Sequence, residues 1–130
     1  MFYHFLIYHI LREIIYANQV LKTVIDNADI EITPKLKFKL LGIMKEFEPI
    51  ISNFEVIRNE LISQYGTKDD EGHISINRED TESMKNFNNA IQPLIEEEVN
   101  VNYKKLSQEE VFTLPSDVLL ALYSLIELED

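Results

Sequence analysis

The residues best suited to bind a metal ion lie in an acidic turn near the middle of the chain. Gly72 stands where an EF-hand calcium loop makes its turn, and Asp69 and Glu71 stand at ligand positions of such a loop. The loop also requires an acid at its first position and a glutamate at its twelfth, but Thr67 and Arg78 occupy these positions. Because both strong ligands are missing, we predict an acidic turn without a metal.

The histidines and the acidic runs offer little more chemistry. His4 and His9 are five residues apart, so a helix would place them about 140° apart, and His73 is remote in sequence. No Glu-x-x-His or His-Glu-x-x-His pattern is present to build a zinc or di-iron site. Consecutive acids such as Glu96-Glu97-Glu98 point in different directions, as on a solvated face. We therefore predict no catalytic residue, no cofactor and no enzymatic activity.

Net charge argues against a nucleic-acid partner. The formal charge is −11, with residues 46–130 at −13 and residues 1–45 at +2. Such a surface repels phosphate backbones and acidic membranes. The lysines at 35, 37, 39 and 45 scatter around a helix and form no stripe. The chain has no cysteine, which fits a reducing compartment such as the cytoplasm.

The apolar run at 1–11, MFYHFLIYHIL, raises the question of a membrane anchor. Arg12-Glu13 interrupt it well short of the roughly 20 apolar residues that a membrane span needs. It also lacks the basic start and small-residue cleavage site of a signal peptide. We expect a helix there and no membrane association.

Two long helices are expected to form most of the core. Apolar residues alternate steps of three and four along both segments, as in a packed helix seam. The spacing predicts helices over 3–25 and 34–65, packed as an antiparallel hairpin, with Thr33-Pro34 as a start signal and Gly66 as a stop. Pro49 falls within the second seam without breaking its spacing, which favours one kinked helix. The first seam comprises Tyr3, Ile7, Ile10, Ile14, Ala17, Leu21, Val24 and Ala28, and the second Leu36, Leu40, Ile43, Phe47, Ile50, Phe54, Ile57 and Leu61.

The remaining sequence predicts two further helices and a short β ribbon. Residues 74–76 and 99–103 alternate apolar and polar side chains, and this favours their pairing as two antiparallel strands. Asn77 is a candidate cap for a helix over the following residues, and Ser107 begins a capping box for a short helical turn. Pro115 opens a last helix that runs to about Leu128. We predict a mostly α fold in a single domain over 1–130.

The last helix has more apolar residues than one core needs. They cover over half of its circumference, and the amino-terminal turn is also apolar. Since exposed apolar patches usually mark association sites, we predict a surface for a protein partner or for self-association at both ends of the chain. The candidate residues are Phe2, Phe5, Leu119, Leu122, Tyr123 and Ile126.

The order of these parts resembles a family of small acidic proteins of unknown function from tailed phages of Gram-positive bacteria. The residues that carry the resemblance are TPKLKFKLLGIMKEFEPIISNFEVIRNELISQYG at 33–66, then KDDEGHISI, FNNAIQPLIEEEVNVNY and LPSDVLLALYSLIE. It covers roughly residues 16–128, while residues 1–15 depart from it. The resemblance implies a phage or prophage origin and expression in the bacterial cytoplasm, and it carries over no catalytic residues.

Three functions remain open from the sequence. The first is a non-catalytic phage accessory protein that binds a phage or host protein. The second is an inhibitor of a host defence or DNA-handling protein that uses the acidic surface. The third is a component of tail or virion assembly, which would place the chain in the virion.

Overall fold

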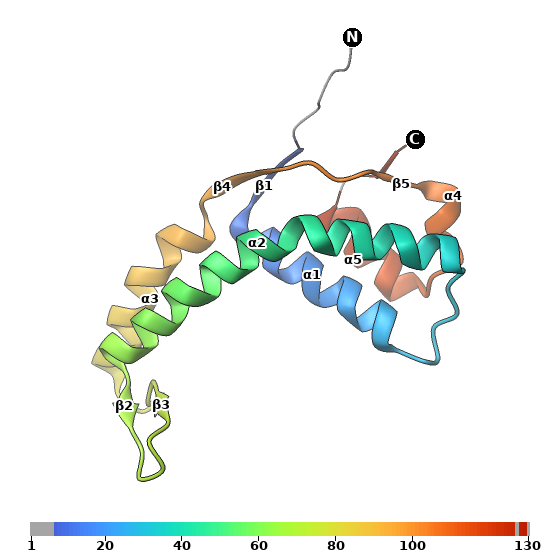
Figure 1. Ribbon diagram of the computed structural model, residues 1–130. Coiled ribbons are helices and arrows are strands. Elements are labelled where there is room, and N and C mark those ends of the chain that lie inside the picture. The colour runs from blue at the N-terminus through green and yellow to red at the C-terminus, as the bar shows by residue number, and fades with distance from the viewer. Residues whose placement is uncertain (1–6, 127, 130) are drawn as a thin grey trace.

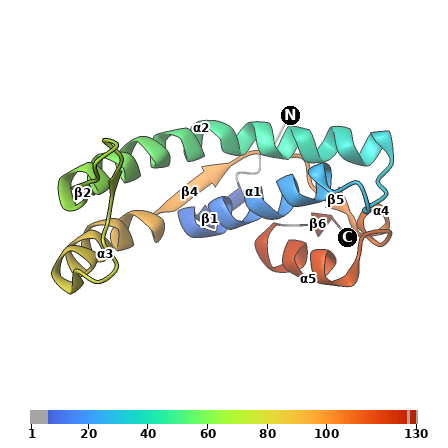
Figure 2. The ribbon, with the colours of Figure 1, turned by 90° about the horizontal axis from the view of Figure 1, so that it is seen from below.

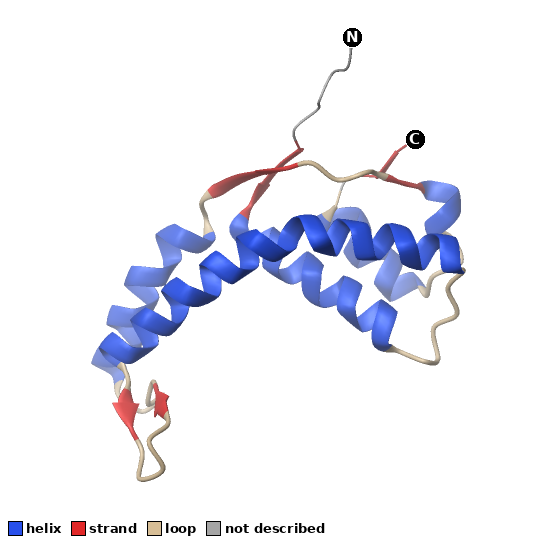
Figure 3. Ribbon diagram, viewed as in Figure 1, coloured by secondary structure: helices blue, strands red, loops and turns tan. Residues whose placement is uncertain are grey.

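The computed structural model describes residues 7–126 and 128–129, and within these the protein is mostly helical, as predicted. Its helices are α1 (Leu11–Asp26), α2 (Pro34–Tyr65), α3 (Thr81–Ile95), α4 (Gln108–Val111) and α5 (Ser116–Leu125). Its strands are β1 (Ile7–Ile10), β2 (Thr67–Lys68), β3 (Ile74–Ser75), β4 (Glu98–Val101), β5 (Leu106–Ser107) and β6 (Leu128–Glu129). Figure 3 shows that the strands are short pieces at the margins of the helices.

Helix α2 is the longest element and runs through Pro49 without interruption. The Thr33 side chain accepts a hydrogen bond from the backbone N–H of Leu36 at 3.1 Å and so caps the first turn. Pro34 follows as the first helical residue, where its missing N–H costs nothing. Figure 1 shows the helix bending along its length, and the prediction of one helix that continues through Pro49 is confirmed.

Helices α1 and α2 pack against one another as the predicted hairpin. The two seams bury each other between the helices and form the centre of the core. From α1 the core takes Ile14, Ala17, Leu21 and Val24, and from α2 it takes Leu36, Leu40, Ile43 and Phe47. The paired seams therefore supply packing, and their spacing alone located this core.

The predicted start of the first helix was wrong within the described residues, because residues 7–10 form β1 and α1 begins only at Leu11. Strand β1 pairs antiparallel with β4, and Ile7 lies opposite Val101. Alternate side chains then point to opposite faces, so Ile7 and His9 are buried while Tyr8 is exposed. Tyr3 lies outside the described residues.

The predicted ribbon between 74–76 and 99–103 was also wrong in its pairing. Strand β3 pairs with its neighbour β2, while β4 pairs with β1. The turn at 69–73 explains the local choice, because the Asp69 carboxylate accepts hydrogen bonds from the N–H groups of Glu71 at 2.9 Å and His73 at 2.8 Å. Gly72 adopts a positive φ of 89° there. A closed local turn costs less chain entropy than pairing across α3.

Helix α3 is capped by Asp80, whose side chain accepts from the N–H of Ser83 at 3.1 Å. The predicted cap, Asn77, instead accepts from the N–H of Glu79 within the preceding turn. The final helix ends at Leu125, earlier than predicted, and β6 follows it and pairs in parallel with β5. Strands β4 and β5 thus lie on one extended stretch whose partners come from opposite ends of the described chain.

The molecule divides into two regions along α2. The body contains β1, α1, residues 34–49 and the described residues from β4 onward, whereas the arm contains residues 50–65, the β2–β3 hairpin and α3 (Figure 2). Nearly all buried apolar residues lie in the body. No residue of α3 is buried, and Phe54 is the buried residue that the described arm contributes.

Candidate interaction surface

The structure separates the predicted partner-binding residues into different environments. Leu122 and Ile126 are buried in the core and do not lie on the surface that we predicted for a partner. Leu119 is half-buried against the core, and Tyr123 is 43% exposed. Phe2 and Phe5 lie outside the described residues. The sequence missed Leu120, which is 70% exposed, because a helix that is apolar on most sides does not reveal which side faces the core.

Exposed apolar side chains occur on α5 and on α1, the helix against which α5 packs. A groove of about 290 Å³ runs between the two helices, and Tyr16, 54% exposed, stands at its edge. Leu120 and Tyr123 follow on the solvent side of α5, three residues apart and therefore neighbours on the helix. We call this surface the terminal patch. Its residues are Tyr16, Val20, Val118, Leu120, Ala121 and Tyr123.

A second groove, of about 400 Å³, lies between α1 and α2. Its apolar lining comes from α2, with Leu41 47% exposed and Met44 and Ile51 half-buried against the core. Charged and polar residues complete the lining, namely Asn18, Lys45, Glu48, Ser52 and Glu55. We call it the α1–α2 groove.

His9 is the candidate for chemistry in the core, but its contacts are those of a structural tie. Its Nε2 lies 2.9 Å from the hydroxyl of Tyr103, within hydrogen-bond distance, and the two rings stack. Tyr103 in turn meets the ring of Phe47 edge to face, at 5.7 Å between centroids. Glu13 lies 3.7 Å from Nδ1, too far for a hydrogen bond. The contacts fasten β1 and the end of β4 to α2.

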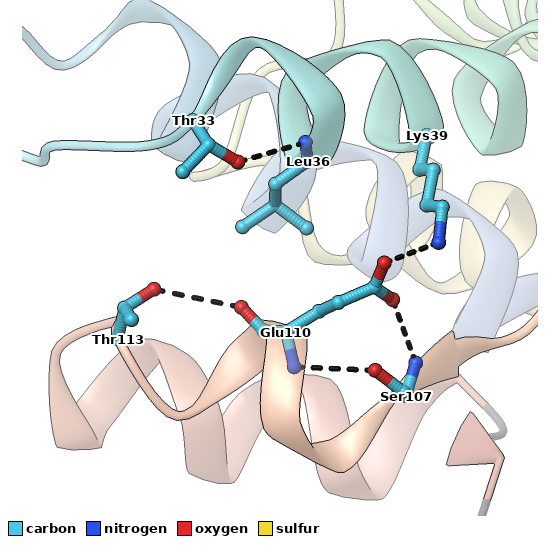
Figure 4. A network of polar contacts seen from close by, with 6 residues as sticks. All are labelled: Thr33, Leu36, Lys39, Ser107, Glu110 and Thr113. Carbon is cyan, nitrogen blue, oxygen red and sulfur yellow. Dashed lines mark hydrogen bonds and ion pairs between the residues drawn. The ribbon is translucent and has the colours of Figure 1, made fainter.

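An ion pair between Lys39 and Glu110 holds α4 against α2 (Figure 4). Both side chains are largely shielded from solvent. The other carboxylate oxygen of Glu110 accepts from the N–H of Ser107 at 2.9 Å, and the Ser107 hydroxyl accepts from the N–H of Glu110 at 3.2 Å. The predicted capping box is therefore present. The Lys39 hydrogen bond and the Ser107 N–H together lower the pKa of Glu110 from 4.5 to about 2.

The acidic turn that resembles part of a calcium loop forms the tip of the β2–β3 hairpin. Asp69 directs one carboxylate oxygen to two backbone N–H groups, which stabilises the turn. His73 lies 3.5 Å from the other oxygen, and both side chains are exposed. Within residues 7–126 and 128–129, no three His, Asp or Glu side chains come together in a way that could hold a metal ion. The described helices also include none whose length and apolar content suit a membrane crossing.

Comparison with protein-family models, curated proteins and solved structures finds no match to this chain. The resemblance to small acidic phage proteins therefore remains a prediction from the sequence. The two grooves and the exposed side chains beside them are the features of the described surface that bear on function.

Proposed function

We propose that this protein is a non-catalytic accessory protein that acts by binding another protein through the terminal patch. The exposure of Leu120 carries the proposal, because a large aliphatic side chain with 70% of its surface in water lies three residues before the exposed Tyr123 on α5. Exposed apolar surface commonly marks a site of association. Tyrosines are also frequent at binding surfaces, since a rigid ring contributes large contact area together with a hydroxyl that can bond to the partner.

The setting that we propose is the cytoplasm of a bacterial host, with a phage or host protein as the partner. The sequence resemblance supports this setting, and the patch supports the mode of action. Hydroxyls and carboxylates line both grooves, but among the described residues none of these hydroxyls donates to a carboxylate that could act as its base, so we favour binding over catalysis.

Charge insertion at the patch tests this function. We expect Leu120→Asp to abolish the recovery of a specific partner when the protein is purified with a tag from phage-infected cells and its companions are quantified by mass spectrometry. Leu120 makes little contact with the core, so circular dichroism should show unchanged folding.

Val56→Asp is the matched control, because Val56 is 58% exposed and lies on the arm, away from the patch. This variant should recover the same partner as the unmodified protein. An identical set of companions for Leu120→Asp and the unmodified protein would refute the role of the terminal patch.

A further inference from the structure

The α1–α2 groove is independent of the terminal patch. Helical spacing places its α1 residue, Asn18, on a different side of α1 from Tyr16 and Val20, which line the groove beside α5. Helix α5 thus occupies one flank of α1, and the α1–α2 groove occupies another. Whatever binds in this groove need not touch α5.

The shape of the groove fits a helix. Its lining on α2 extends from Leu41 to Glu55, roughly 21 Å at 1.5 Å per residue. Two packed helices present a furrow between them in which the apolar side of a third helix can lie. Leu41, Met44 and Ile51 recur at three- and seven-residue steps and would form the floor beneath such a helix.

The charges of the groove specify the chemistry of its occupant. Glu48 and Glu55 are seven residues apart on α2, so both carboxylates stand along the same edge about two turns from each other. Neither forms an ion pair with any described residue, although Lys45 lies three positions before Glu48 and Arg58 lies three positions after Glu55 on α2. The Arg58 guanidinium instead lies over the ring of Phe54, and Lys45 is the one cation in the lining. The lining therefore holds two carboxylates and one ammonium, which leaves a negative excess along this edge.

We propose that the α1–α2 groove binds an amphipathic helix of a partner protein, with an apolar stripe and lysines or arginines about seven residues apart. The apolar stripe would cover Leu41, Met44 and Ile51, and the basic residues would pair with Glu48 and Glu55. A second copy of this chain is a poor occupant because each copy carries a charge of −11.

Two synthetic peptides test whether the groove prefers a helix with basic residues. Each is a hydrocarbon-stapled helix of about 15 residues, the length that spans the groove, with a leucine stripe; one carries two lysines seven residues apart and the other glutamates at the same positions. In fluorescence anisotropy at low salt, we expect the lysine peptide to bind roughly tenfold more tightly than the glutamate peptide. The difference should shrink as salt is added, because exposed ion pairs are screened.

Charge reversal locates the binding site. The double variant Glu48→Lys/Glu55→Lys should reverse the preference, so that the glutamate peptide binds better. Glu60→Lys makes the same change at an exposed position of α2 outside the groove and should leave the preference intact. Leu41→Asp should weaken the binding of both peptides.

An unchanged preference in the double variant, or an equal effect of Glu60→Lys, would overturn the proposal. So would self-association of the unmodified protein that Glu48→Lys/Glu55→Lys disrupts, since a second copy would then cover the groove. Leu120→Asp should bind the lysine peptide normally, which separates this result from the outcome for the terminal patch.

Discussion

The body and the arm are built on the same helix but reach very different degrees of burial. In the body, α2 packs beneath α1 and the segments that follow β4, and Phe47 is fully buried. In the arm, α2 meets α3 and a two-strand hairpin, and Ile57 on the same predicted seam is 40% exposed. A regular seam therefore identifies the side of a helix that can pack, whereas the number of neighbours determines how much of it becomes buried.

Truncating an aromatic side chain in each region should give the largest difference in unfolding free energy between the body and the arm. We expect Phe47→Ala to lower the free energy of unfolding by about 3–5 kcal/mol, because it leaves a cavity among fully buried neighbours. Phe87→Ala in α3 should cost only about 1–2 kcal/mol, since Phe87 is half-buried. Urea unfolding of both variants gives the comparison. Equal losses would show that the arm is packed as tightly as the body.

Removing the Lys39–Glu110 ion pair of the body should give the next largest loss of unfolding free energy. Glu110→Gln should lower the free energy of unfolding by about 2 kcal/mol near pH 7, because the Lys39 ammonium and the Ser107 N–H would lose the carboxylate charge.

The pH dependence has a definite sign. The pKa of Glu110 is lowered from 4.5 to about 2 in the folded state, so its stabilisation is complete above the unfolded value and is lost as pH falls from about 4.5 to 2. The difference in unfolding free energy between the unmodified protein and Glu110→Gln should shrink over that interval. Glu109→Gln, at an exposed neighbour, should show no such trend. A constant difference down to pH 2 would contradict this account of the ion pair.

Substitutions at two glycines, Gly42 within α2 and Gly66 directly after it, should give the smallest changes in unfolding free energy and still distinguish the body from the arm. A Cβ at Gly66 would lie 2.4 Å from the carbonyl oxygen of Ile62 and 2.8 Å from that of Ser75, so Gly66→Ala should cost about 1–2 kcal/mol by pushing the hairpin away from α2. A Cβ at Gly42 meets nothing within 4 Å, and Gly42→Ala should stabilise the helix by about 0.5–1 kcal/mol.

Thermal unfolding of the two glycine variants supplies the measurement. The expected result is a pair of shifts of opposite sign in the melting temperature. Stabilisation by Gly66→Ala would mean that the hairpin does not pack against the end of α2.

Sequence spacing predicted the paired helices because their seams extend over many turns. It failed at residues 7–10, since Ile7 and Ile10 fit a helix seam while Ile7 and His9 equally fit one face of a strand. Pairing with β4, distant in sequence, decided between them. On α5 the prediction failed for another reason. Apolar residues lie on most sides of this helix, so the sequence alone does not show which side packs against α1.

The pairing of β1 with β4 also sets an order of assembly. Residues 11–97 lie between these strands, so their pairing closes a long loop and must follow the local formation of the helices. During synthesis, β1 emerges early and has to wait until residues 11–97 have been made before β4 can pair with it, whereas β5 waits only for residues 108–127 before β6 follows. We therefore expect the helical hairpin to form first and the stretch from β4 to β5 to pair with β1 and β6 afterwards.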